Sequence, residues 1–401
     1  MHFVRVRTEE RRSLKCNKCR VWRFLKIKKY KVVQQGIEID FVNFPVLVCP
    51  KCGKECLSEK GENELRKFIR LAKSKNTNKL EVSKKYIKDF NKKKFFYKGS
   101  LEFDYCYLDS EFIPGLRRFS AGGALIPVFF KIKVLLKYLS DPQYGLYFSS
   151  DSYGHIYKGK HELISFGINR NNKVIFWYCD LYKLQKKEQH YLISENIRSD
   201  HDIGSDFYIA EIRAEYPKPS KEIQLEGFRA KLNNKFGKRY KFNLYTDGIE
   251  NIRAIRDIIK PIIWNKKWVK DTIQSLHLLH IESLNEELLK LEITKLDSSI
   301  NLKNIDGSIN LLKQWLDLRF KKLNSQTIVA PLYALNTFRN IFSHKKNKTR
   351  YNKDLRKICK KLNLPENTKN LKVIYESLIK ELTNSYDELS KVIKIRKSTK
   401  V

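Results

Sequence analysis

The chain lacks any long apolar segment. Its 401 residues contain no uncharged apolar run of about 18 residues, and the first residues, MHFVRVRTEERR, contain no apolar core of a signal peptide. We find no amphipathic anchor, lipidation motif, internal repeat or Gly/Ser-rich linker. These absences argue against a membrane protein and against secretion, and we expect a cytoplasmic location.

Acidic residues are also scarce. The chain carries 81 Lys and Arg against 44 Asp and Glu, a formal net charge of +37 that exceeds what solubility requires. We therefore expect a nucleic-acid partner, either RNA or DNA. Lysine supplies most of the cations and acts as a point charge, which favours attraction to phosphates over reading of bases. AT-rich genomes also yield lysine-rich proteins, so part of this bias can be mutational. Hydrophobic residues make up 42%, enough for buried cores, so the charge does not imply disorder.

Four cysteines form two C-x-x-C turns, Cys16 with Cys19 and Cys49 with Cys52. Each turn points two thiolates at one centre, and two turns supply the tetrahedral sulfur set that Zn²⁺ prefers. Four sulfurs leave no open coordination position, so we expect structural zinc. Cys56 departs from this pattern and either competes as a ligand or packs. The alternative of exposed redox dithiols lacks a surrounding thioredoxin-like βαβ pattern.

The residues around these cysteines predict a zinc ribbon. Residues 31–41 alternate as strands do, residues 44–48 lead a strand into Cys49, and a helix is expected over residues 62–71. The apolar strand, the Cys-Pro-Lys-Cys-Gly turn and the helix resemble the YgiT-type zinc finger of antitoxin-like proteins. We assign residues 1–71 to this ribbon. Residues 72–98 form a basic linker whose aromatic side chains either stack on bases or pack on the buried side of a helix.

Residues 99–247 predict a central domain of α+β or mainly β structure whose role the sequence does not indicate. Strands are expected over residues 101–108, 144–150, 156–158, 173–179 and 207–215. The segment Asp200-His201-Asp202, with Glu188 upstream, offers oxygen and imidazole ligands for a divalent ion. Ser, Asp and His in this order are also typical of a capped turn, the interpretation we favour.

Residues 248–401 show the periodicity of helices. Apolar residues recur at helical spacing over residues 272–293, 306–323, 330–343, 354–362 and 371–393, which predicts an all-α bundle and makes the whole chain a multidomain α+β protein. One helix carries Arg339, Asn340 and His344. An arginine can hold a phosphate and a histidine can move a proton. Helical spacing places Arg339 on the flank of the apolar stripe and His344 on the opposite side. The alternative is a solvated helix end at which His344 faces the helix dipole.

The motif Arg339-Asn340-x-x-x-His344 resembles the active-site signature of HEPN ribonucleases, which are helical bundles. This resemblance covers the C-terminal third of the chain. It implies a homodimeric, metal-independent RNA endonuclease, a hydrolase acting as a prokaryotic toxin or in antiviral defence. It also implies that His344 is a general acid or base, that Arg339 stabilises the transition state, and that Asn340 orients one of them or the phosphate.

A basic run follows the motif. Lys345, Lys346, Lys348 and Arg350 lie in it, and such a run is either a solvated face or a surface for RNA phosphates. The alternative function is a non-catalytic nucleic-acid-binding or antitoxin-like zinc-ribbon protein whose helical bundle only dimerises. For both functions we expect zinc as a structural ion. The RNA cleavage reaction is expected to need no cofactor.

Overall fold

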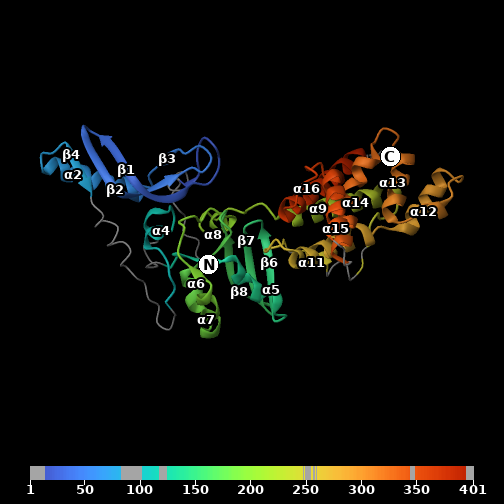
Figure 1. Cartoon of the computed structure of the whole chain (residues 1–401), viewed down its shortest axis with the longest axis horizontal. Helices are drawn as coiled ribbons and strands as arrows, with labels where there is room; N and C mark the ends of the chain where they lie inside the picture. Colours follow the sequence, from blue (N-terminus) through green and yellow to red (C-terminus); the bar gives the residue numbers. More distant parts are fainter. Residues whose placement is uncertain are drawn as a thin grey trace, which may run out of the picture. The chain divides into compact units, whose positions relative to one another are not determined.

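The computed structural model describes residues 14–82, 102–116, 124–246, 248, 254, 255, 258, 260–343 and 348–393. The chain divides into two compact units, Met1–Lys218, called here the sheet unit, and Pro219–Val401, called here the helical unit. Figure 1 shows an N-terminal sheet and a central sheet in the first unit and helices in the second. This arrangement agrees with the multidomain α+β architecture expected from the sequence.

The N-terminal sheet is built around strand β2 (Ile37–Val48). Strand β1 (Phe24–Gln34) pairs with it antiparallel through a two-residue turn, and both turn residues, Gln35 and Gly36, have positive φ, as tight hairpins require. On its other edge β2 pairs with β3 (Glu55–Cys56) antiparallel and with β4 (Lys79–Val82) parallel. The expected strand leading into Cys49 is thus the second half of one long strand.

Helix α2 (Glu59–Ser74) packs on this sheet. Ser58 caps it by accepting from the backbone N–H of Gly61 at 3.2 Å, and Leu65 and Ile69 are buried in the sheet core. The helix expected over residues 62–71 is present and is longer at both ends. Residues 72–82, which the sequence assigned to the linker, form the end of α2 and strand β4. Residues 83–98 lie outside the described residues.

The central sheet has six antiparallel strands in the order β10-β5-β9-β8-β7-β6. Its strands are β5 (Pro127–Lys131), β6 (Tyr144–Ser150), β7 (Tyr153–Lys158), β8 (His161–Ile168), β9 (Lys173–Trp177) and β10 (Asn196–Ile197). Short helices surround it: α4 (Tyr107–Phe112), η1 (Ile132–Leu135), α5 (Leu136–Ser140), α6 (Tyr178–Lys183), α7 (Lys186–Ser194) and α8 (Asp206–Glu211). The strands expected over residues 144–150, 156–158 and 173–179 are confirmed in substance.

The strands expected over residues 101–108 and 207–215 are wrong: the described part of the first segment forms no strand and ends in helix α4, and the second begins with helix α8. Phe207 of this helix lies against Gly167 of β8 so closely that a Cβ on the glycine would come within 2.7 Å of it. Phe207 also stacks on Trp177, with ring centroids 4.8 Å apart. Aromatic residues favour strands locally, and here burial of one helix face against the sheet outweighs that preference.

A single hydrophobic cluster joins the N-terminal and central sheets. It contains Leu14, which precedes the N-terminal sheet, and Leu25 and Leu47 of that sheet, together with Leu108 and Phe112 of α4, all nearly inaccessible to solvent. Residues from the central sheet and α8 complete the cluster: Phe129, Ile175, Trp177, Ile203, Phe207, Tyr208 and Ile212. The N-terminal sheet therefore has its own core with α2 and a second cluster that it shares with the central sheet.

The helical unit is a bundle. Its elements are α9 (Lys221–Tyr240), α11 (Lys266–His277), the π-turn η2 (Leu278–Glu282), α12 (Glu286–Leu296), η3 (Leu302–Asn304), α13 (Ser308–Arg319), α14 (Ser325–Ser343), α15 (Lys348–Lys361) and α16 (Leu371–Val392). Helix α14 packs against α11, α13, α15 and α16. Helix α9, which the sequence placed in the central domain, packs along α16 and buries Leu225, Leu232 and Phe236 in the bundle core. The expected helix over residues 272–293 is interrupted by η2 and restarts at the cap Asn285.

The buried side chain of His280 links three elements of the bundle. His280 of η2 lies 3.1 Å from Oε1 of Glu226 on α9 and 2.7 Å from the hydroxyl of Tyr386 on α16. Burial alone would raise the pKa of Glu226, but the His280 charge outweighs it and lowers that pKa. The opposite charges of Glu226 and His280 compensate each other in the interior. This contact, with that to Tyr386, therefore favours one arrangement of α9, η2 and α16.

Candidate functional site

The four cysteines predicted to bind metal are brought together. Cys16 and Cys19 precede β1, Cys49 and Cys52 follow β2, and all four Sγ atoms lie within 4.8 Å of one another. The Sγ atoms of Cys16 and Cys52 are 3.7 Å apart. Ligands at about 2.3 Å from a tetrahedral zinc are separated by roughly 3.8 Å. The spacing and the sulfur chemistry therefore fit a zinc ion.

The two cysteine turns have the same backbone geometry. The N–H of Arg20 donates to the carbonyl of Cys16, and the N–H of Gly53 donates to the carbonyl of Cys49, each at 2.9 Å. Arg20 and Gly53 both have left-handed backbones, with φ of 57° and 69°. Cys56 lies on β3 outside the four-sulfur cluster and packs against the shared core, and burial raises its pKa. Packing, one of the two roles left open for Cys56, is what the structure shows.

The motif on α14 is described in part. Arg339 and Asn340 lie half-buried near the end of α14, and Nη1 of Arg339 donates to Oδ1 of Asn340 at 3.3 Å. Leu332, Leu335 and Phe338 of the expected stripe are buried in the bundle core. His344 lies outside the described residues, as do Lys345 and Lys346. The structure thus brings together two of the three predicted motif residues.

A histidine that the sequence analysis missed lies beside this motif. Nε2 of His277 is 3.1 Å from Oδ1 of Asn336, one turn before Arg339 and Asn340 on the same helix, and Nδ1 of His277 is 2.9 Å from Oε1 of Glu282. His277 ends α11 where the π-turn begins, and π-turns are frequent at functional sites. Two histidines inside the apolar run 276–281 were the signal available in the sequence.

Helix α15 presents a basic face. Lys348 and Arg350, two of the predicted phosphate-binding residues, are exposed on its first turn. Further cations lie at positions 353, 356, 357, 360 and 361 of the same helix. Burial and the neighbouring charge of Lys357 lower the pKa of Lys361. A groove of about 400 Å³ is lined by Lys357, Lys360 and Lys361, by residues 326, 327, 330 and 331 in the first half of α14, and by Asn363 and Glu381.

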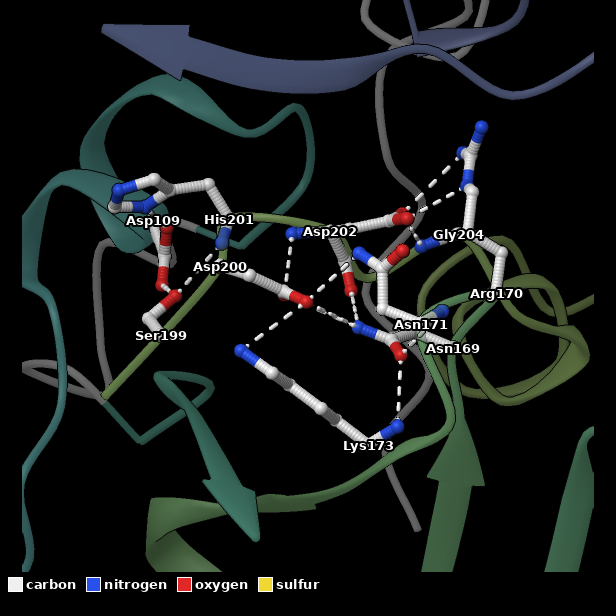
Figure 2. Close-up of polar contacts among 10 residues, drawn as sticks. All are labelled: Asp109, Asn169, Arg170, Asn171, Lys173, Ser199, Asp200, His201, Asp202 and Gly204. Atoms are coloured by element: carbon white, nitrogen blue, oxygen red, sulfur yellow. Dashed lines mark hydrogen bonds and ion pairs between the residues drawn. The ribbon is translucent and has the colours of Figure 1, made fainter. Parts of the chain in front are cut away.

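The Asp200-His201-Asp202 segment is a capped turn, as favoured from the sequence (Figure 2). Asp202 pairs with Arg170, Nε to Oδ2 at 2.6 Å, and accepts from the N–H of Gly204 at 3.0 Å. Burial raises the pKa of Asp202. The Asp200 carboxylate is held by residues of the loop before and at the start of β9: Asn169, Asn171 and Lys173. The carboxylates of Asp200 and Asp202 are therefore engaged in hydrogen bonds and ion pairs with the turn and with residues 169–173.

His201 points away from these two aspartates, toward Asp109 (Figure 2). Its Nδ1 lies 2.7 Å from Oδ1 of Asp109, and Oδ2 of the same carboxylate accepts from Oγ of Ser199 at 2.6 Å. Cys106, just before α4, joins them: its Sγ, an Asp109 oxygen and a His201 nitrogen lie within 4.8 Å of one another. The sequence analysis did not anticipate this cluster, because its members come from segments 92 residues apart.

No family model, curated protein or solved structure matches this chain. None of the helices within the described ranges combines the length and the apolarity needed to cross a membrane.

Proposed function

We propose that the protein is a metal-independent RNA endonuclease of the HEPN type. The observation that carries the proposal is the contact between Arg339 and Asn340, 3.3 Å apart, at the end of the helix around which the bundle packs. The two polar side chains flank a buried apolar stripe and keep part of their surface in solvent. An arginine held in this way can meet a phosphate without leaving a cavity in the core.

In this function the ribose 2′-hydroxyl attacks the adjacent phosphate. His344 acts as general acid or base, and Arg339 stabilises charge on the phosphorane-like transition state. Asn340 holds the guanidinium of Arg339 through its side-chain oxygen. Two copies of the chain would combine their motifs in one composite site, which makes the enzyme a homodimer through the helical unit.

The basic face of α15 supports RNA as the substrate. Its exposed cations follow the motif directly in the sequence, and three of its lysines line the groove against α14. Burial and, after it, the charge of Lys357 lower the pKa of Lys361, and a bound phosphate would offset the repulsion between the two lysines. A role as a prokaryotic toxin or antiviral effector in the cytoplasm follows from the HEPN resemblance and belongs to the same proposal.

Zinc completes the proposal as a structural ion. Cys16, Cys19, Cys49 and Cys52 would hold it, and it would join the two cysteine turns at the base of the β1–β2 hairpin. Four thiolates close the coordination shell, so the ion takes no part in cleavage.

The test is RNA cleavage by the purified full chain with and without EDTA. We expect cleavage in both conditions, and losses of roughly 10²–10⁴-fold in rate for His344→Ala and a comparable loss for Arg339→Ala. Arg319→Ala and His161→Ala are matched controls, because both side chains are exposed and lie outside the motif. Both controls should cut at the parental rate.

Two results would contradict the proposal. Parental cleavage rates in both motif variants would remove the motif from the mechanism. Retention of RNA or DNA on the parental chain without any cleavage would select the non-catalytic nucleic-acid-binding protein instead.

A further inference from the structure

The cluster of Cys106, Asp109 and His201 in the sheet unit has no part in RNA cleavage as proposed above. Asp109 is fully buried, and both of its oxygens are used: one meets Nδ1 of His201 and the other accepts from Ser199. A buried carboxylate that binds Nδ1–H fixes the histidine tautomer and orients its ring. The second ring nitrogen, Nε2, takes no part in the bond to Asp109 and can exchange a proton with another group.

The distances distinguish this cluster from the zinc site. Two ligands at about 2.0 Å from a tetrahedral zinc are roughly 3.3 Å apart, whereas the His201 nitrogen and the Asp109 oxygen are 2.7 Å apart. The sulfurs of Cys16 and Cys52, at 3.7 Å, do show metal spacing. The shorter distance is that of a charge-assisted hydrogen bond. The contact between Asp109 and His201 is therefore the kind of hydrogen bond that orients a histidine.

Cys106 is the third member of the cluster, with its Sγ within 4.8 Å of an Asp109 oxygen and a His201 nitrogen. Burial favours a neutral His201, but hydrogen bonding and charge from Asp109 and Cys106 outweigh it and raise the pKa of His201 to about 10. An imidazolium beside a thiol favours the thiolate, which is the nucleophilic form of cysteine. Burial raises the pKa of Cys179 to about 12 and also raises the pKa values of Cys56 and Cys359, so these three thiols are weak nucleophiles at neutral pH.

A cavity gives this thiol access to a small molecule. Cys106 and His201 line a cavity of about 690 Å³, and Asp109 is not among the residues that line it. The remaining wall combines aromatic and charged side chains, including Phe103, Tyr105, Tyr107, Glu102, Asp104 and Arg198. His201 has a left-handed backbone with φ of 62°, a conformation that costs energy outside glycine and clusters at functional sites. Its N–H donates to Ser199 at 2.9 Å, which helps to hold that conformation.

We propose that Cys106 is the nucleophile of a second active site, with His201 as its base and Asp109 orienting His201, and that the site takes acyl compounds, namely esters or amides. Sγ of Cys106 bonds to the carbonyl carbon while the bond from that carbon to the leaving oxygen or nitrogen breaks. His201 takes the thiol proton and passes it to the leaving group. Water then hydrolyses the thioester and returns the proton to sulfur.

Thiol reactivity is the first test. The zinc-loaded full chain is treated briefly with iodoacetamide at neutral pH, and modification of each cysteine is followed by peptide mass spectrometry. Alkylation joins sulfur to carbon and releases iodide. Cys106 should react roughly tenfold faster than Cys179 and Cys56, because it lines the cavity and has His201 beside it to take its proton. His201→Ala and the isosteric Asp109→Asn should each remove most of that advantage without changing the rate at Cys56.

Acylation is the second test. Mixing the chain with p-nitrophenyl acetate should release a burst of about one equivalent of p-nitrophenolate and leave an acetyl group on Cys106. Cys106→Ser should lose the burst, and Cys179→Ser, a matched half-buried cysteine, should keep it.

Three outcomes would overturn the proposal. The first is alkylation of Cys106 no faster than that of Cys179. The second is fast alkylation without acylation, which would reject the acyl substrate. The third is two zinc ions per chain with one lost in Cys106→Ser, which would make the cluster a metal site.

Discussion

At the scale of single residues, buried charges in this protein are compensated by several partners. Glu188 was a candidate ligand from the sequence, and it is instead enclosed by Lys137 at 2.7 Å and by the hydroxyls of Tyr138, at 3.1 Å, and Tyr144. Burial alone would raise the pKa of Glu188, but hydrogen bonds from these three side chains and the Lys137 charge outweigh it and lower the pKa. Its carboxylate therefore stabilises the fold only while it is ionised.

Glu188→Gln should destabilise the sheet unit in a pH-dependent way. The folded pKa of Glu188 lies below the unfolded value, so its contribution is present above about pH 4.5 and is lost as the pH falls through the lower folded value. Urea denaturation should show a cost of about 3 kcal/mol at pH 7 that shrinks below pH 4.5. Glu215→Gln, which breaks an exposed pair with Arg213, is the control and should cost under about 1 kcal/mol. An unchanged difference between pH 7 and pH 3 would contradict this role.

The cysteines give a second prediction at this scale. The purified chain should contain one zinc ion, and Cys49→Ser should release it and unfold the ribbon, because metal binding and folding are coupled. Cys56→Ser should keep the zinc, since Cys56 lies outside the four-sulfur cluster. Elemental analysis of freshly prepared protein measures both. Chains without zinc, or zinc loss in the Cys56 variant, would show that the ligand set is different.

At the scale of elements, the two cysteine turns are equivalent in hydrogen bonding and unequal in strain. Gly53 adopts its left-handed backbone at little cost, whereas Arg20 adopts the same conformation with a side chain attached. Space does not limit Gly53, because an added Cβ would meet nothing within 4 Å. Substitutions at these two positions therefore act through the backbone.

We predict opposite effects at the two positions. Gly53→Ala should lower the free energy of unfolding of the zinc-bound protein by about 1 kcal/mol, and Arg20→Gly should raise it by up to about 1 kcal/mol. Denaturation at saturating zinc measures both changes. Gly53→Asn is the control and should cost less than alanine, because asparagine tolerates the left-handed region. Equal losses at both positions would refute the assignment of strain to Arg20.

The elements that local pattern determines were predictable from the sequence. The cysteine cluster and the helices α13 to α16 follow from spacing and periodicity, whereas the turn at Gln35 and Gly36 divides the strand segment expected over residues 31–41. Helix α8 did not follow, since Phe207 finds its partner Gly167 only in the folded sheet unit. The Asp109–His201 contact joins residues 92 apart and was invisible for the same reason. His277 was overlooked because a histidine in an apolar run gives no sign of which polar side chain it will meet.

At the scale of the whole molecule, the net charge of +37 dominates expected binding behaviour. We predict that affinity for RNA falls steeply with salt, because bound lysines release counterions from phosphates. Contacts to about five phosphates would give a slope of log affinity against log salt near −3.5 to −4.5. Fluorescence anisotropy with a short labelled RNA, titrated between low and physiological salt, measures this slope. A flat dependence would show that the positive charge serves another partner.

The hydrophobic cluster shared by the N-terminal and central sheets limits where recombination can divide this gene without harming the folding of its products. Leu14, Leu25 and Leu47 bury the same surface that Leu108 and Phe112 need. A recombination event that exchanged only the ribbon would leave both halves with exposed leucine and phenylalanine, and the products would tend to aggregate. Exchange at the boundary between Lys218 and Pro219 separates two compact units and avoids that exposure. Homologous genes should therefore encode the N-terminal sheet and the central sheet together.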